Sequence, residues 1–251
     1  MMRKESQIKL FEGDCLTILK TLPTDSVDLV LADMPYGTTR CKWDTVIPLN
    51  KLWIELNRVA KQTTPFVLFC AQPFTTILIN SNLTHFKYTW VWEKPHAKGH
   101  LNAKKRPMVS HEDIAVFYRK QCLYVPQMTE GHALKTATKD KRLNSEVYNN
   151  NTKTVSYSST SRYPRSCQRF KQDTQKSSLH PTQKPLGLNE YLIKTYTNKG
   201  DTVLDFCMGS GTTGVACLNQ SRKFVGIEKC PEIFKTAKTR IMKDYEKTGT
   251  D

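Results

Sequence analysis

Acidic residues are scarce in this sequence, and long apolar segments are missing. The 23 Asp and Glu residues are outnumbered by 38 Lys and Arg residues, which gives a formal net charge of +15. An excess of this size favours a polyanionic partner. The N-terminal region carries charges at positions 3–5 and no uninterrupted apolar stretch, so we expect neither a signal peptide nor a membrane segment. We therefore expect a cytoplasmic protein.

Close cysteine pairs are also absent. The eight cysteines stand far apart and form no Cys-x-x-Cys motif. This spacing indicates neither a zinc knuckle nor a disulfide framework. We expect reduced thiols and no metal site.

The positive charge is concentrated in one third of the chain. Residues 94–173 include 16 basic and 6 acidic residues, and aromatic residues are interleaved with them, as in Arg162-Tyr163 and Arg169-Phe170. Such a mixture suits nucleic acid, although a solvated basic loop is the simpler interpretation for any single residue. Because the apolar pattern fades between Gln121 and Leu179, we expect residues 121–178 to form an insertion rather than more sheet.

The rest of the chain alternates short apolar runs with helical patterns, which is typical of one α/β domain. Helices are predicted at 15–22, 52–61 and 231–247. Strands are predicted at 8–11, 27–32, 66–71, 87–92, 113–118, 202–206 and 223–227.

One predicted strand stops on a carboxylate. Val30-Leu31-Ala32 is followed by Asp33-Met34-Pro35-Tyr36-Gly37. A carboxylate, a backbone carbonyl and a flat ring can grip a planar group that carries an amine, such as a nucleobase. An ordinary turn at the end of a strand is the alternative.

A second strand, Thr202–Phe206, leads into a glycine-containing turn and a helix. Gly209 and Gly211 allow the backbone to approach a ligand, and Thr212 and Thr213 can serve the exposed amides of the helix. Glu228 ends the next strand, where dinucleotide-type folds hold ribose hydroxyls. The sequence thus predicts a nucleoside site, and NAD stays an alternative because residues 209–214 match G-x-G-x-x-G.

The turn comes late in the chain, so the sheet must take its other strands from earlier segments. This arrangement predicts a circular permutation, with the strand before Asp14 as a neighbour. Asp14 is then placed at the adenine end of the ligand, or it is only the N-cap of the following helix.

These segments resemble an amino-methylating DNA methyltransferase of the group in which the target motif precedes the cofactor motif. Asp33-Met34-Pro35-Tyr36 resembles the family's Asp-Pro-Pro-Tyr signature, and residues 205–213 resemble its S-adenosylmethionine loop. The segments His180-Pro181-Thr182-Gln183-Lys184-Pro185 and His111-Glu112-Asp113-Ile114 match as well. The resemblance covers nearly the whole chain except about residues 121–178.

The resemblance implies a circularly permuted, Rossmann-like α/β methyltransferase sheet, mostly parallel with one antiparallel strand, formed by residues 1–120 and 179–251. It implies methyl transfer from S-adenosylmethionine to the N6 amine of a flipped-out adenine in double-stranded DNA. Restriction-modification is one biological context for such an enzyme, and a stand-alone phage or chromosomal role is the alternative. The catalytic residues are then Asp33, Met34, Pro35 and Tyr36. The cofactor-binding residues are Asp14, His180, Thr182, Asp205, Phe206, Gly209, Ser210, Gly211, Thr212, Thr213 and Glu228.

Alternatives stay open. Cytosine-N4 methylation is the nearest, followed by an NAD-dependent oxidoreductase and a non-catalytic DNA-binding protein. A homodimer is compatible with the sequence, which does not determine the oligomeric state. Lys184 invites a place near the methionine end of the cofactor, whereas we interpret His111 and Glu112 as structural, because neighbours on a strand face opposite ways.

Met34 is the one departure from the family signature. It replaces the first of two prolines, and its carbonyl can still accept a hydrogen bond from the target amine. The replacement removes some backbone stiffness, so we expect it to affect the rate rather than the chemistry.

Overall fold

A computed structural model describes residues 7–38, 44–138, 156–171 and 183–248. The chain divides into two compact units, one formed by residues 1–125 and 166–251 and the other by residues 126–165. The second unit lies within the expected insertion. Its strands β6 (Lys135–Thr138) and β7 (Ser156–Ser159) pair in antiparallel fashion.

The larger unit is built on an eight-stranded sheet in the order β1-β10-β9-β2-β3-β5-β4-β8. The strands are β1 (Ile8–Glu12), β2 (Leu29–Ala32), β3 (Phe66–Cys70), β4 (Phe86–Lys98), β5 (Val109–Phe117), β8 (Cys167–Arg169), β9 (Thr202–Asp205) and β10 (Lys223–Glu228). Only β5 runs against its neighbours. The predicted permuted, mostly parallel sheet with one antiparallel strand is therefore confirmed.

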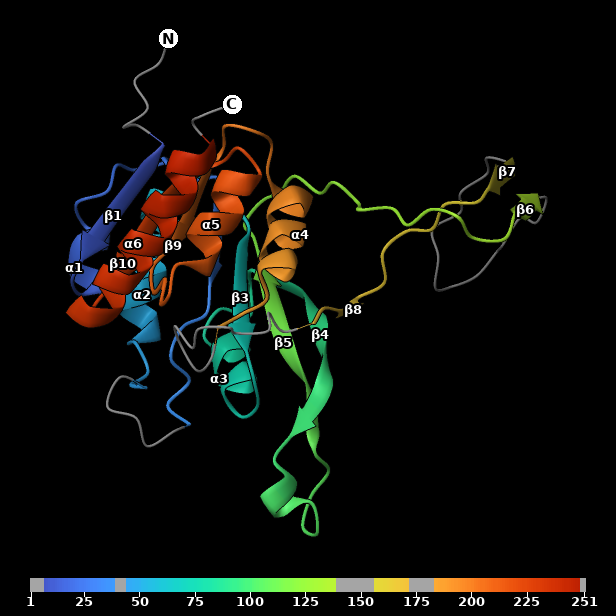
Figure 1. The fold of residues 1–251 in the computed structure, drawn as a ribbon, viewed down its shortest axis with the longest axis horizontal. Coiled ribbons are helices and arrows are strands. Elements are labelled where there is room, and N and C mark those ends of the chain that lie inside the picture. The colour runs from blue at the N-terminus through green and yellow to red at the C-terminus, as the bar shows by residue number, and fades with distance from the viewer. Residues whose placement is uncertain (1–6, 39–43, 139–155, 172–182, 249–251) are drawn as a thin grey trace. The chain divides into compact units, whose positions relative to one another are not determined.

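The helices cover both faces of this sheet (Figure 1). They are α1 (Cys15–Leu19), α2 (Leu49–Val59), α3 (Phe74–Asn80), α4 (Leu186–Tyr196), α5 (Thr212–Asn219) and α6 (Pro231–Thr248), and a short 3₁₀ helix, η2 (His100–Asn102), follows β4. Residues of α1, α2 and α3 enter one core cluster, and residues of α4, α5 and α6 enter the other.

Strand β2 shows why the sheet is buried on both sides. Val30 and Ala32 belong to one cluster, and Leu29 and Leu31 belong to the other, because successive side chains of a strand point to opposite faces. All four are essentially inaccessible to solvent. A strand covered by helices on both faces reads as a continuous apolar run, which is the pattern that the sequence displays.

Two segments depart from the expectations. Cys167–Arg169 joins the main sheet beside β4, so the expectation of no sheet between 121 and 178 is wrong at this point. The strand is three residues long and mostly exposed, and therefore carries no apolar signature. Strands β4 and β5 also extend further than predicted, because the three residues at the outer end of each strand are exposed and carry no apolar alternation.

Among the described residues, no helix is long and apolar enough to span a membrane.

Candidate active site

The carboxyl ends of the parallel strands bring the two predicted motifs together. β2 and β9 are paired neighbours, with Val30 opposite Leu204. Asp33, just after β2, and Asp205, the last residue of β9, therefore meet at one edge of the sheet although they lie far apart in the sequence. A cavity of about 590 Å³ opens at this edge and is lined by both.

Most of the predicted site residues line this cavity. They are Asp14, Asp33, Met34, Pro35, Tyr36, Asp205, Phe206, Gly209, Ser210, Thr212, Thr213 and Glu228. Gly211 is not among the lining residues; a side chain there would collide with Ile241 of α6, so its glycine serves close helix packing. His180 and Thr182 lie outside the described residues.

Asp33 is held by two donors. The Tyr36 hydroxyl donates to Asp33 Oδ1 at 2.7 Å, and Lys184 Nζ lies 2.8 Å from Asp33 Oδ2. Lys184 Nζ also lies 2.9 Å from Glu112 Oε2, and Lys94 donates to the other oxygen of Glu112. Two ammonium groups thus balance two carboxylates in a largely buried network.

Opposite charges in this network stabilise the ionised forms of Lys184 and Glu112. Burial disfavours the charged form of Lys184, but the carboxylates of Asp33 and Glu112 outweigh it and raise the pKa of Lys184. Burial likewise works against ionised Glu112, but Lys184 and Lys94 outweigh it and lower the pKa of Glu112. Burial, reinforced by the Asp33 carboxylate, raises the pKa of Tyr36, so its hydroxyl stays a donor.

Glu112 and Lys184 also belong to the candidate site. Sequence reasoning missed the contacts that Lys184 makes with Asp33 and Glu112. Glu112 faces the cavity, whereas its neighbour His111 is exposed, so the two side chains do point in opposite directions. The matched His-Glu segment was a signal, but it did not reveal which side chain faced inward.

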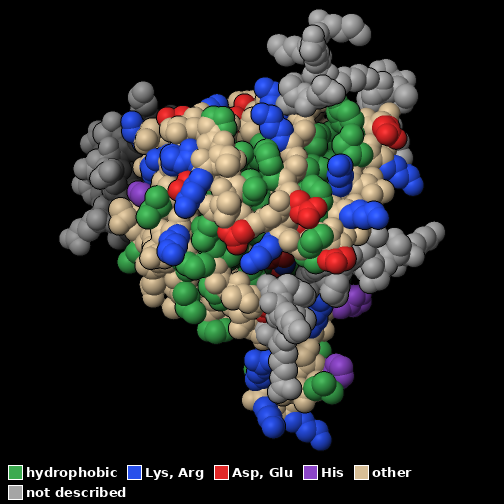
Figure 2. Space-filling model, turned by 90° about the vertical axis from the view of Figure 1, so that its left-hand side faces the viewer, with side chains coloured by type: hydrophobic (Ala, Val, Ile, Leu, Met, Phe, Trp, Pro, Cys, Tyr) green, Lys and Arg blue, Asp and Glu red, His purple; other side chains and the backbone are tan. Residues whose placement is uncertain are grey.

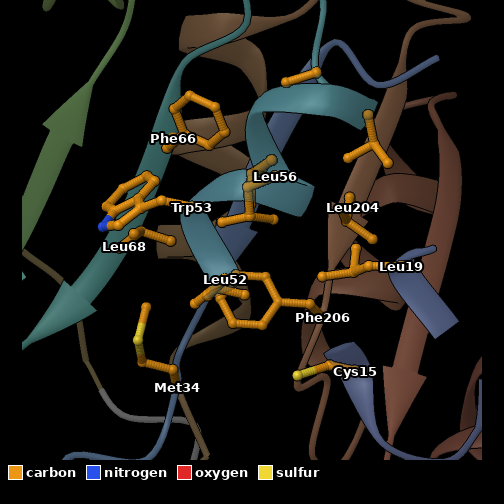
Figure 3. Close-up of a cluster of buried hydrophobic side chains, with 14 of the residues drawn as sticks. Cys15, Leu19, Met34, Leu52, Trp53, Leu56, Phe66, Leu68, Leu204 and Phe206 are labelled. Carbon is orange, nitrogen blue, oxygen red and sulfur yellow. The ribbon is translucent and has the colours of Figure 1, made fainter. Parts of the chain in front are cut away.

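The Met34 side chain turns away from the cavity wall into the core. It is 2% exposed and extends into the cluster that contains Leu52, Leu68 and Phe206 (Figure 3). The backbone of Met34 therefore borders the cavity while its thioether fills the space beneath it. A proline at this position would leave much of that space empty.

Tyr36 forms a rigid aromatic wall. Its ring stacks on Phe74 with 5.3 Å between the centroids and 20° between the planes. The chain after it is fixed because the Gly37 and Thr38 amides donate to the Asp44 carboxylate at 2.7 and 2.9 Å. The wall is consequently held in place from two sides.

The glycine turn after β9 is braced by two acids. Asp205 accepts hydrogen bonds from the Thr213 hydroxyl at 2.7 Å and the Cys207 amide at 3.2 Å. Glu228 accepts from the Gly209 amide at 3.0 Å and the Cys230 amide at 2.9 Å. Gly209 has φ of 52°, a left-handed conformation that favours glycine.

Burial raises the pKa of Asp205 to about 7, even though the Thr213 hydroxyl and Cys207 amide stabilise its anion. Asp205 is 3% exposed, and the donors that contact its carboxylate, the Thr213 hydroxyl and the Cys207 amide, are neutral.

Arg240 of α6 is a further brace that the sequence pattern did not reveal. Its guanidinium donates to the Ser210 carbonyl and to the Thr212 hydroxyl, both at 3.1 Å. Asp14 caps α1 by accepting from the Leu16 amide at 3.0 Å, and it also lines the cavity. The capping and ligand-binding interpretations of Asp14 are therefore compatible.

Among the residues that the structure describes, no group of His, Cys, Asp and Glu side chains is arranged to hold a metal ion.

The permuted sheet, with a cavity at the carboxyl ends of its strands, defines a Rossmann-like α/β fold of the class adopted by DNA methyltransferases. A family model described as DNA methylase (N6_N4_Mtase) matches residues 27–239, and the chain belongs to this family. The oxidoreductase and non-catalytic alternatives are thereby set aside.

Individual relatives agree with this assignment. The chain is 30% identical over 253 residues to the DNA adenine methyltransferase YhdJ of Escherichia coli (strain K12), covering 92% of this chain and 82% of that protein. It is 25% identical over 256 residues to the type II methyltransferase M.HpaI of Haemophilus parainfluenzae, covering 97% of this chain and 76% of that protein.

Solved structures show the same likeness. The M1.HpyAVI–SAM complex superimposes with a TM-score of 0.63 at 26% identity, covering 93% of this chain and 98% of that one. The cytosine-N4-specific PvuII DNA methyltransferase superimposes with a TM-score of 0.65 at 15% identity, covering 97% and 93% of the two chains, which supports the fold alone.

Proposed function

We propose that this protein transfers a methyl group from S-adenosylmethionine to the N6 amine of an adenine that is flipped out of duplex DNA. The observation that carries the proposal is that one cavity is lined at the same time by Asp33 and Tyr36 and by the glycine turn with Glu228. The residues proposed to hold the methyl donor and those proposed to hold the acceptor base therefore line one cavity.

The cavity fits S-adenosylmethionine in size and chemistry. Its volume of about 590 Å³ falls within the ordinary range of small-molecule sites. The turn at Gly209 lets a ligand approach the backbone, and Glu228 and Asp14 offer carboxylate oxygens to hydroxyl groups. When bound, the cofactor supplies a methyl group on a positively charged sulfur.

Asp33 and the Met34 carbonyl activate the target amine. The lone pair of an exocyclic amine is delocalised into the ring, so the amine is a weak nucleophile. If Asp33 and the Met34 carbonyl accept its two N–H bonds, the nitrogen can pyramidalise and direct the lone pair at the methyl carbon. Both acceptors stabilise the positive charge that develops on nitrogen, and the surplus proton leaves along the bond to Asp33.

Lys184 and Tyr36 leave Asp33 able to accept a hydrogen bond from the target amine. Each carboxylate oxygen can accept two hydrogen bonds, and each oxygen of Asp33 contacts one donor in the structure. The remaining acceptor positions are open to the amine, while the two donors fix the plane of the carboxylate. Tyr36, backed by Phe74, offers a surface on which the flipped base stacks and recovers part of the cost of leaving the duplex.

Adenine is favoured over cytosine by a relative that matches most of the chain and whose name states its base. YhdJ, named an adenine methyltransferase, is 30% identical across 92% of the chain, whereas the cytosine-specific PvuII enzyme is 15% identical. Asp33 also resembles the adenine form of the signature. In the cytosine form, Ser is commoner at this position. Cytosine-N4 methylation is the second candidate, because its amine presents the same chemistry.

The expected insertion, residues 121–178, is proposed to select the DNA sequence. Within its described part, Tyr163 is 74% exposed, whereas the Arg162 guanidinium is bound to backbone carbonyls and serves local structure. Exchanging residues 121–178 for those of a relative should change the methylated sequence and leave cofactor affinity intact. Unchanged sequence specificity would refute this role.

The decisive experiment compares Asp33→Ala with Asp25→Asn. Asp25 is exposed in a turn at the opposite end of β2, and Asn tolerates its positive φ of 51°. With tritiated S-adenosylmethionine, Asp33→Ala should bind cofactor but transfer no methyl group, while Asp25→Asn should match the wild type. Chromatography of the digested DNA should show N6-methyladenine; N4-methylcytosine would select the second candidate, and active Asp33→Ala would refute the mechanism.

A further inference from the structure

The hairpin formed by β4 and β5 continues well beyond the sheet. All residues from His96 to His111 are exposed. This segment, called the β4–β5 arm below, contains four Lys or Arg residues, three His residues and no acidic residue. Figure 1 shows it projecting past the end of the sheet, and Figure 2 shows basic and histidine side chains gathered on the projection.

The arm contributes nothing to the described core. None of its residues belongs to either core cluster. Its two strands pair with each other through Lys98 and Val109, and His111 pairs with Glu93 at the base of the arm. An exposed, sparsely paired extension costs conformational entropy and gains little from burial. Such segments, carried on a rigid scaffold, commonly serve binding.

One apolar side chain stands out on this basic arm. Leu101, in η2, is 87% exposed, more than any other large hydrophobic residue in the described chain. It lies between Lys98 and the run Lys104-Lys105-Arg106. A single exposed Leu is ordinary by itself, but one framed by cations on a projecting hairpin is suited to a partner that has both phosphates and an apolar stack.

The arm begins at the cavity. Trp92, Lys98 and Glu112, which lie at its base, all line the cavity. Leu101 is three residues beyond Lys98, so its backbone lies at most about 11 Å further along the chain. A duplex that delivers a base into the cavity therefore passes within reach of Leu101.

We propose that the β4–β5 arm grips duplex DNA, with Lys104, Lys105 and Arg106 on the phosphates and Leu101 inserted into the base stack beside the flipped base. The inference rests on the proposed function, because it assumes a base flipped into the cavity. Leu101 fills the space that the base vacates and so opposes its return, as apolar wedges do in proteins that distort DNA.

The wedge is tested with Leu101→Ala and a matched control, Leu83→Ala. Leu83 is also exposed, at 63%, and precedes β4 at the other end of that strand. The substrates are two duplexes that contain the methylated site, mapped by sequencing DNA from cells that express the protein. One is fully paired, and the other has an abasic position opposite the target adenine.

Leu101→Ala should lower kcat/KM about tenfold on the paired duplex and much less on the abasic duplex, where the base is already unpaired. Leu83→Ala should match the wild type on both. Equal rates for Leu101→Ala and the wild type, or an equal loss on the two duplexes, would overturn the wedge. If the wild type methylates neither duplex, the proposed function fails first, which separates the two failures.

The phosphate grip is tested by the salt dependence of DNA binding. Lys104→Ala/Lys105→Ala/Arg106→Ala should reduce the slope of log Kd against log salt by about 3. The control replaces Lys194, Lys199 and Lys223, which are exposed near the amino edge of the sheet. An unchanged slope in the arm variant, or an equal change in the control, would refute the grip.

Discussion

Lys184 Nζ lies 2.8 Å from Asp33 Oδ2, and its side chain is only 9% exposed. The segment before α4 thus delivers a buried ammonium to the carboxylate that ends β2. Glu112 accepts from the same ammonium at 2.9 Å, so Lys184 joins the two carboxylates on this wall of the cavity. A buried charge of this kind is tolerated only while it is balanced.

The first prediction concerns this balance. Lys184→Met leaves two carboxylates with one ammonium and should lower the free energy of unfolding by about 3–5 kcal/mol. Lys184→Met/Glu112→Gln restores neutrality with Asp33 and Lys94, so it should lose clearly less than the sum of the two single variants. Urea denaturation of the four proteins measures the coupling. Additive losses would show that the network is not energetically linked.

The second prediction separates the two roles of Tyr36. Tyr36→Phe removes the hydroxyl that donates to Asp33 at 2.7 Å but keeps the ring on Phe74, so kcat should fall roughly tenfold. Tyr36→Ala removes the wall as well and should lower kcat further and weaken binding of the flipped base. Single-turnover kinetics and 2-aminopurine fluorescence distinguish the steps. Equal effects of the two variants would mean that the ring does not stack on the base.

The third prediction is that Met34 stabilises the core beneath the site. Met34→Ala opens a cavity beside Leu52 and Phe206 and should cost about 2–5 kcal/mol, whereas Met34→Leu should cost less than about 1.5 kcal/mol. Met242→Ala, at a position 37% exposed, is the matched control and should change stability by less than about 0.5 kcal/mol. Denaturant midpoints provide the measurement, and a small loss for Met34→Ala would contradict the packing role.

Sequence reasoning could identify the residues that directly follow a buried strand, but not the residues of distant segments that contact them. Asp33, Asp205 and Glu228 follow apolar runs, and parallel strands share their carboxyl edge, so their meeting was predictable. The contact between Lys184 and Asp33 depends on how a distant, irregular segment crosses that edge, for which no periodicity exists. The β4–β5 arm was missed for the opposite reason: exposed strands carry no apolar alternation.

The fourth prediction follows from the pKa of about 7 that burial gives Asp205, against an ordinary value of 3.8. The native protein then keeps a proton that the unfolded chain loses, so the free energy of unfolding should fall as pH rises from about 4 to 7 and level off above that. A shift of this size corresponds to roughly 4 kcal/mol at most. Asp205→Asn cannot ionise, and its stability should decline less over the same range in denaturation experiments. Thr239→Ala, at an exposed position on α6, serves as the control and should keep the wild-type slope. Identical slopes for the wild type and Asp205→Asn would show that the Asp205 carboxyl is already ionised throughout, with its charge stabilised by the turn that it braces.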